Sequence, residues 1–90
     1  METAPFHEHE LESQTASFHA TSNREELTRS EVCGCYHCLE LFFPEEIAEY
    51  VDEEQTALCP HCGVDSVVGS ASGLPMDRDF LLRVRRRFFC

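Results

Sequence analysis

The sequence predicts a small α+β domain, and three observations lead to this prediction. The chain has only 90 residues, and six of them are Cys. Two apolar stretches have the length of short strands, and the last segment has the period of an amphipathic helix. A chain this short hides only about 60% of its unfolded surface on folding. Its core therefore needs a metal, a disulfide or a partner, and the Cys residues are the obvious means.

Charge is unevenly distributed along the chain. Seven Arg, no Lys and seventeen acidic residues give a net charge of −10. Residues 30–77 hold ten acidic residues and no basic one, whereas residues 78–90 carry a net charge of +4. Non-specific coating of nucleic acid or of an anionic membrane requires many cations, so the charge excludes it. Any contact with nucleic acid or another acidic partner is then local, and its candidate residues are Arg83, Arg85, Arg86 and Arg87.

The sequence also bears on the cellular compartment. No stretch approaches the roughly 20 apolar residues that span a membrane. The first twenty residues contain four Glu, no Lys or Arg and no apolar core, unlike a secretory signal. We therefore expect a cytoplasmic protein without membrane contact, in which closely spaced Cys bind metal or act in redox chemistry.

Two C-x-x-C pairs form the strongest motif. Cys35 and Cys38 make the first pair, and Cys59 and Cys62 make the second after twenty intervening residues. This spacing is at the upper end for a four-thiolate zinc site. Four thiolates fill the zinc coordination shell and leave no position for water, so we expect one structural Zn²⁺ and no enzyme activity. A thioredoxin-like redox pair is the alternative, but it requires a βαβ unit that this chain does not offer.

Neighbouring residues leave two further questions about this site. Cys33 lies two residues before Cys35, so the sequence leaves open whether it substitutes as a ligand, although a buried spare thiol is the simpler interpretation. His37 and His61 each lie immediately before the second Cys of a C-x-x-C pair. Side chains at this position usually point away from the metal. Leu39 follows the first pair where rubredoxin iron sites usually have Gly, which favours zinc over iron.

Caps, prolines and apolar periods predict the remaining elements. Ser22 to Glu25 reads as a capping box, and Pro44 reads as the first residue of a helical turn. We expect the following elements: a flexible polar tail over 1–20, a helix over about 23–31, a strand over 39–43, a short helix with Ile47, Tyr50 and Val51 on its buried face, a strand at 67–68, a loop over 69–75, and a helix capped at Asp77 with Phe80, Leu81, Val84 and Phe88 inside. Residues 21–90 then form one domain.

Several segments together resemble a known family. They are the run from Cys33 to Cys38, Phe43-Pro44, Glu46-Ile47 and the run from Gln55 to Gly69. The chain is similar over about residues 19–89 to a family of short, uncharacterised bacterial cytoplasmic proteins with a zinc-ribbon, or rubredoxin-like, four-Cys centre. This resemblance implies two Cys knuckles, a short antiparallel sheet, flanking helices and a bound metal, and it implies no reaction.

The sequence contains no nucleophile paired with a base and no phosphate-binding loop. We therefore predict a structural zinc domain that acts as a protein-interaction or regulatory module, with a protein as its partner. A nucleic-acid-binding zinc ribbon that uses the Arg-rich C-terminal helix is one alternative. A rubredoxin-like electron carrier with iron is the other.

Overall fold

The computed structural model describes residues 8–89, with side chains from residue 13 onward. The elements follow one another as α1 (Glu8–His19), α2 (Arg24–Thr28), β1 (Cys33–Cys35), β2 (Leu41–Phe42), the 3-10 turn η1 (Pro44–Glu46), β3 (Tyr50–Val51), β4 (Thr56–Ala57), β5 (Val67–Gly69), the 3-10 turn η2 (Ser70–Ser72) and α3 (Arg78–Phe88). The predicted small α+β class with short antiparallel sheets and a C-terminal helix is confirmed.

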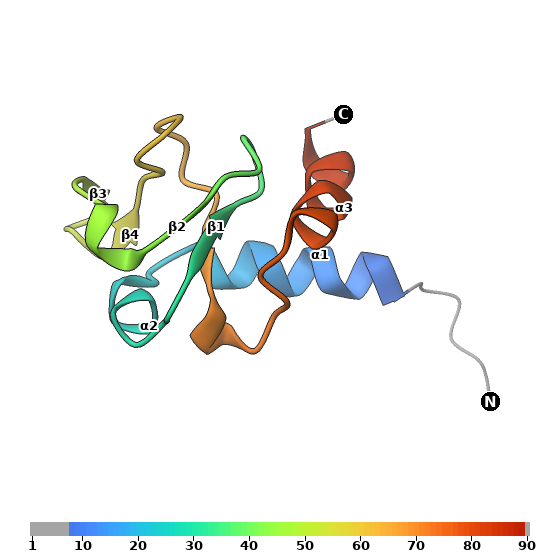
Figure 1. Cartoon of the computed structure of the whole chain (residues 1–90), viewed down its shortest axis with the longest axis horizontal. Coiled ribbons are helices and arrows are strands. Elements are labelled where there is room, and N and C mark those ends of the chain that lie inside the picture. Colours follow the sequence, from blue (N-terminus) through green and yellow to red (C-terminus); the bar gives the residue numbers. More distant parts are fainter. Residues whose placement is uncertain (1–7, 90) are drawn as a thin grey trace.

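The strands form two small antiparallel sheets. The larger sheet has the order β2-β1-β5, and β3 pairs with β4 in a separate hairpin. In the larger sheet Cys33 lies opposite Gly69 and Cys35 lies opposite Val67. Figure 1 shows α1 and α3 on one side of this sheet and the hairpin on the other. The sheet therefore separates two apolar clusters, one beside α1 and α3 and the other on the hairpin side.

Each cluster has its own composition. The cluster beside α1 and α3 contains the following buried residues: Ala16, Ala20, Tyr36, Val68, Phe80, Leu81 and Val84. The other contains Leu27, Cys33, Cys35, Phe42, Ile47, Ala57, Cys59 and Val67. Gly34 lets α3 approach the sheet, because a Cβ there would lie 2.9 Å from Leu81 Cδ1. Cysteine thus takes the place of larger apolar side chains in the second cluster.

The N-terminal segment differs from the flexible tail that we expected. Residues 8–19 form α1, which packs against α3. Ser13, Ala16 and Ala20 are buried, so small side chains make the packed stripe from residue 13 onward. The period of large apolar residues gave no signal for such a stripe. Residues 1–7 of the expected tail lie outside the described residues.

The predicted capping box at Ser22 is wrong. Asn23 occupies the N-cap position of α2, and its side chain makes no capping bond. Ser22 instead has φ 48°, and its backbone N–H donates to Thr56 Oγ1 at 2.8 Å. The helix spans five residues rather than the nine expected over 23–31. Contacts to β4 and β5, which are distant in sequence, therefore decide the local geometry.

The short helix predicted after Pro44 is also wrong. Only one 3-10 turn forms, and Ile47 then extends with ψ 122° toward β3. Ile47 is buried as predicted, whereas Val51 is exposed, because both Tyr50 and Val51 lie in a strand. Acidic residues 52–54 follow with φ between 56° and 68° and turn the chain back into β4.

The C-terminal half agrees better with the sequence. The carboxylate of Asp77 accepts the N–H of Phe80 at 2.8 Å and caps α3 as predicted. Phe80, Leu81 and Val84 are fully buried, but Phe88 is 44% exposed. The buried stripe of α3 therefore ends one turn earlier than the periodicity indicated. The strand at 67–68 extends by one residue to Gly69, and the expected loop begins with η2.

None of the helices in the part of the chain that the structure describes has the length and apolarity to cross a membrane.

Candidate metal centre

Four thiols converge at one end of the larger sheet. Cys35 ends β1 and Cys38 lies in the following turn, whereas Cys59 and Cys62 lie in the turn between β4 and β5. Figure 1 shows both turns projecting from the same end of the sheet. Their four Sγ atoms lie within 4.8 Å of one another. The antiparallel pairing of β1 and β5 thus brings together two Cys pairs that are distant in sequence.

The closest sulfur contacts run between the two turns. The Sγ atoms of Cys35 and Cys62 are 3.6 Å apart, and so are those of Cys38 and Cys59. Tetrahedral coordination with zinc–sulfur bonds of about 2.3 Å separates the sulfurs by about 3.8 Å. The four thiols therefore fit around one such ion, and the donor set is the one that zinc and iron favour.

Both turns direct a backbone amide at their first sulfur. The N–H of His37 donates to Cys35 Sγ at 3.4 Å, and the N–H of His61 donates to Cys59 Sγ at 3.3 Å. Such donors stabilise negative charge on sulfur. The two turns therefore offer equivalent electrostatic support to a thiolate.

The two turns also end alike. The N–H of Leu39 donates to the carbonyl of Cys35 at 2.8 Å, and that of Gly63 donates to the carbonyl of Cys59 at 2.9 Å. Leu39 has φ 70° and Gly63 has φ 81°. A left-handed Leu costs about 1–2 kcal/mol, so the surrounding structure must impose this conformation. Leu39 therefore does not prevent the first turn from matching the second.

Burial and the local donors shift the thiol pKa values in different directions. Burial raises the pKa of Cys35 above its usual range, although the N–H groups of Cys38 and His37 oppose the rise. Burial also raises the pKa of Cys38 to about 11. At Cys59 burial acts in the same direction, but donation from His61, Cys62 and the neighbouring thiols lowers the pKa overall. A cation is what would hold all four groups as thiolates in so small a space.

Cys33 lies apart from this cluster. Its side chain is fully buried in β1, and its thiol does not belong to the group of four among the residues described. Burial raises its pKa to about 12, with contributions from Glu45 and Glu46. A buried thiol of this kind is unreactive, in agreement with the spare-thiol interpretation.

The two His side chains lie outside the sulfur cluster. His61 Nε2 is 3.8 Å from Glu46 Oε1, and the His61 ring is next to Phe42. The His37 ring meets the Phe89 ring edge to face at 4.8 Å. Its Nδ1 is buried and has no hydrogen-bond partner in the described part of the chain. Neither His belongs to the metal-binding group.

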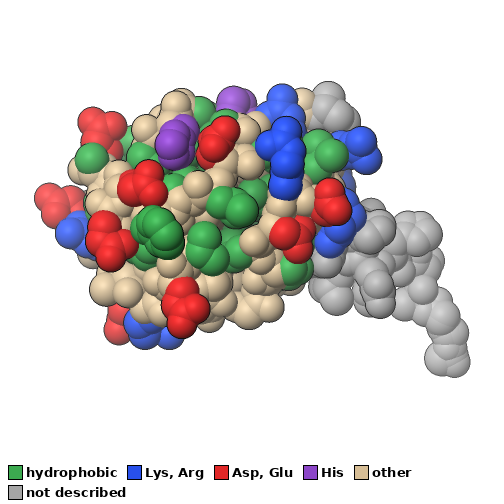
Figure 2. Space-filling model, viewed as in Figure 1, with side chains coloured by type: hydrophobic (Ala, Val, Ile, Leu, Met, Phe, Trp, Pro, Cys, Tyr) green, Lys and Arg blue, Asp and Glu red, His purple; other side chains and the backbone are tan. Residues whose placement is uncertain are grey.

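The predicted arginine contacts lie on α3, and they are not equivalent. Arg85 donates to the carbonyl oxygen of His37 and so joins α3 to the first Cys turn. Arg86 and Arg87 are exposed, and neither forms a hydrogen bond or ion pair with a described residue. Arg83 is half-buried. Figure 2 shows Arg side chains gathered over α3, with acidic side chains beside them and over the opposite end of the molecule.

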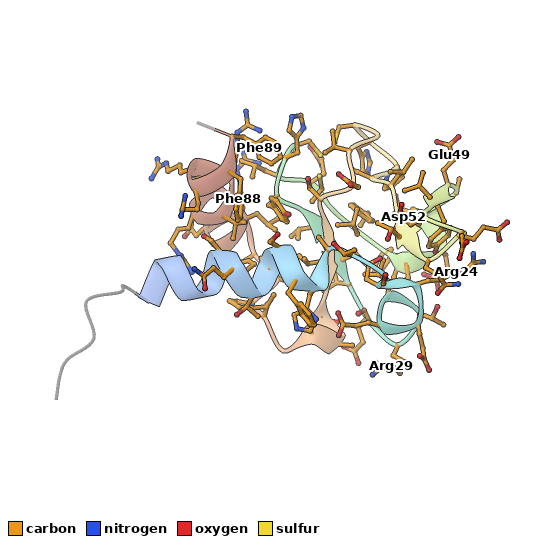
Figure 3. All side chains as sticks on the ribbon, turned by 180° about the vertical axis from the view of Figure 1, so that it is seen from behind. Arg24, Arg29, Glu49, Asp52, Phe88 and Phe89 are labelled. Atoms are coloured by element: carbon orange, nitrogen blue, oxygen red, sulfur yellow. The ribbon has the colours of Figure 1, made fainter. Side chains whose placement is uncertain are left out.

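Two aromatic residues beside these arginines were not predicted as site residues. Phe88 and Phe89 are 44% and 40% exposed, and Figure 3 shows them together at the end of α3. Both rings lie about 6 Å from the Tyr36 ring, which belongs to the first Cys turn. The sequence signal for an exposed aromatic residue was the Phe88-Phe89 pair, because Phe89 falls outside the apolar stripe of the helix. The contact with the Cys turn had no signal in the sequence.

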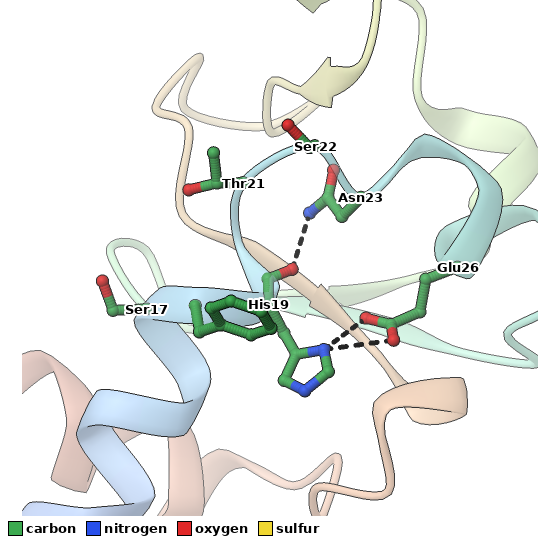
Figure 4. Close-up of a pocket in the computed structure, with 7 residues that line it drawn as sticks. Ser17, His19, Thr21, Ser22, Asn23 and Glu26 are labelled. Atoms are coloured by element: carbon green, nitrogen blue, oxygen red, sulfur yellow. Dashed lines mark hydrogen bonds and ion pairs between the residues drawn. The ribbon is translucent and has the colours of Figure 1, made fainter.

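A separate cavity of about 590 Å³ lies where α1 meets α2. His19 Nδ1 is 2.8 Å from Glu26 Oε1 at its edge, and Asn23 donates to the His19 carbonyl, as Figure 4 shows. Hydroxyl groups of Ser17, Thr21 and Ser22 line the same hollow. No hydroxyl or thiol of a described residue is hydrogen-bonded to His19, so this pair lacks the contact that activates a nucleophile.

Comparison of the chain with protein-family models, with curated proteins and with solved structures finds no match.

Proposed function

We propose that this chain is a small cytoplasmic zinc-binding protein with a structural four-Cys site, and that it acts as an interaction or regulatory module rather than as an enzyme. The convergence of Cys35, Cys38, Cys59 and Cys62 carries the proposal. Zinc bound there uses all four thiolates, so it provides a cross-link and keeps no open position for a substrate.

The position of the four thiols explains what the ion would do. They join the turn after β1 to the turn before β5, and Cys35 and Cys59 are also part of an apolar cluster. The strands around this cluster are only two or three residues long. Structural zinc contributes on the order of 10 kcal/mol in small peptides, which is comparable to the whole stability of a small domain. Folding of the chain is therefore expected to depend on the metal.

The surface that this cross-link supports favours an interaction role. Arg85 and Phe89 contact His37, so the first Cys turn and the end of α3 hold each other in place. The end of α3 also carries the exposed Arg86 and Arg87. The affinity of a partner that binds this surface would therefore depend on whether the metal is bound.

Metal analysis of the purified full chain tests the proposal. We expect a colourless protein with one zinc per chain and with near-UV circular dichroism from the buried Tyr36. Removal of the metal with a strong chelator, or Cys59→Ser, abolishes both the metal and the signal. Cys33→Ala is the matched control, since this buried thiol lies outside the group of four, and it retains both. A chain that stays folded without metal would contradict the structural role.

Iron in the same site is the second candidate. The left-handed conformation of Leu39 is compatible with iron, because the missing Gly does not prevent a rubredoxin-like turn. A red, redox-active protein with iron in place of zinc would establish the electron-carrier function and overturn the zinc proposal.

A further inference from the structure

We propose that the end of α3 binds single-stranded nucleic acid, with bases stacked on Phe88 and Phe89 and with phosphates held by Arg86 and Arg87. These four residues are called the aromatic–arginine surface below. The inference rests on the zinc-stabilised module proposed above, because the first Cys turn supports this surface.

The rings of this surface are exposed but held in place. Phe88 and Phe89 keep 44% and 40% of their surface in contact with solvent, although both are large apolar residues. Each packs on Tyr36, and Phe89 also packs on His37. Tyr36 is only 6% exposed, so it forms a firm base beneath the two rings. Exposed rings on a rigid base are the platform on which unpaired bases stack, independently of sequence.

Two cations at the same end of α3 are available to a ligand. Arg86 and Arg87 are exposed and have no ion pair or hydrogen bond to any residue in the described range. The acidic residues of 30–77 therefore leave these two charges uncompensated. Arg87 also lies 5.9 Å from the centre of the Phe88 ring, so cation and ring face the same site. This juxtaposition fits a ligand that alternates anionic groups with flat rings.

A hollow next to the rings favours a base over a phosphate. A cavity of about 250 Å³ is lined by Phe88 and Phe89 and by polar groups that include Ser66 and Asp65. The apolar wall suits the face of a base, and the polar groups suit its edge. The carboxylate of Asp65 would repel a phosphate, so the backbone of the ligand must follow the arginines outside.

These features select a single strand over a duplex and over an acidic peptide. Bases in a duplex are stacked on one another and cannot reach the two rings without unpairing. An acidic peptide would pair with the arginines but would make no use of the exposed ring faces. The negative charge of the remaining chain limits the contact to a few nucleotides.

Fluorescence anisotropy of zinc-loaded full chain at low salt tests the proposal. The probes are a short labelled oligothymidylate, a hairpin duplex and an oligoglutamate peptide. We expect binding of the oligothymidylate, at least fivefold weaker binding of the other two, and a log–log salt slope of about −1.4. Failure to bind the oligothymidylate, or equal binding of all three, overturns the proposal.

Matched variants separate stacking from charge. The double variant Phe88→Leu with Phe89→Leu keeps apolar side chains but removes the aromatic rings, and it should weaken binding at least fivefold. The double variant Phe88→Tyr with Phe89→Tyr keeps the rings, and it should bind as tightly as the unsubstituted chain. Arg86→Ala with Arg87→Ala should reduce the salt-dependence slope by about 1.4, because each phosphate contact contributes about 0.7 for single strands. Arg29→Ala, which removes an exposed charge at the other end of the molecule in Figure 3, should change nothing.

Metal content and near-UV circular dichroism of each variant distinguish the two proposals. A folded, zinc-loaded protein that does not bind the oligonucleotide overturns only the binding inference. A protein that folds without bound metal overturns the proposed function instead. Binding that the Leu and the Ala variants leave unchanged also contradicts the assignment to the aromatic–arginine surface.

Discussion

Asn23 Nδ2 donates to the backbone carbonyl of Val67 at 2.8 Å, across forty-four residues of sequence. The same side chain donates to the carbonyl of His19 at 3.0 Å and accepts the N–H of Ala57 at 3.2 Å. Asn23 is only 2% exposed. One buried amide therefore joins the end of α1 to β4 and β5, the two strands on either side of the second Cys turn.

Asn23→Ala removes all three bonds and leaves the Val67 carbonyl and the Ala57 N–H without their partner. Unsatisfied buried groups cost about 1–3 kcal/mol each, so the two groups together should lower the free energy of unfolding by about 2–6 kcal/mol. Urea unfolding of the metal-loaded protein measures it. Gln55→Ala, at a nearby exposed position, is the control and should change stability little. Equal stability of the two variants would show that the amide does not join these elements.

The role of Asn23 shows where prediction from the sequence fails. The local pattern from Ser22 to Glu25 satisfies a capping box, but the partners that Asn23 finds lie on β4 and β5. Similarly, Ile47, Tyr50 and Val51 have helical spacing, but pairing with β4 places the last two in a strand. By contrast, the cap at Asp77 depends on near neighbours, and the two C-x-x-C pairs have the spacing of a four-thiolate site, so the sequence predicted both the cap and the Cys cluster.

Ala16 tests whether α1 belongs to the packed domain. It is fully buried in the cluster with α3, so Ala16→Glu places a carboxylate among apolar side chains. Burial of an unpaired charge is strongly unfavourable, and we expect a loss of more than about 2 kcal/mol. Gln14→Glu adds the same carboxylate at an exposed position of α1 and should have little effect. Thermal unfolding compares them, and identical midpoints would favour the flexible tail that the sequence predicted.

Gly69 tests the packing between β5 and α2. A Cβ at this position would lie 2.2 Å from Ser30 Oγ and 2.8 Å from Leu27 Cδ2. Ser30 cannot move freely, because its hydroxyl donates to the Glu26 carbonyl and accepts the Ala71 N–H. We therefore expect Gly69→Ala to destabilise the protein by about 1–3 kcal/mol.

A double-mutant cycle provides the control for this position. Ser30→Gly removes the nearest atoms, so it should relieve part of the cost of Gly69→Ala, and the two changes should not be additive. Gly73→Ala meets no atom within 4 Å, so its cost arises from φ 86° alone and should add independently to Ser30→Gly. Additivity in both cycles would show that Gly69 is not closely packed against Ser30.

Asp77 tests the attachment of α3, on which the aromatic–arginine surface depends. Asp77→Ala removes the acceptor for the Phe80 N–H and should cost about 1 kcal/mol, whereas Asp77→Asn should retain most of the cap. Asp79→Ala, at an exposed site in the first turn, is the matched control for lost charge. Urea unfolding ranks the three variants. If Asp79→Ala costs as much as Asp77→Ala, helix-dipole charge rather than capping accounts for the effect.

X-ray absorption spectroscopy at the zinc edge of the metal-loaded full chain tests the central claim most directly. Four sulfur neighbours at about 2.3 Å, and no nitrogen or oxygen in the first shell, are the result expected from Cys35, Cys38, Cys59 and Cys62. Cys33→Ala should leave this spectrum unchanged. A first shell with fewer than four sulfurs, completed by a histidine nitrogen or by water, would contradict the closed structural site.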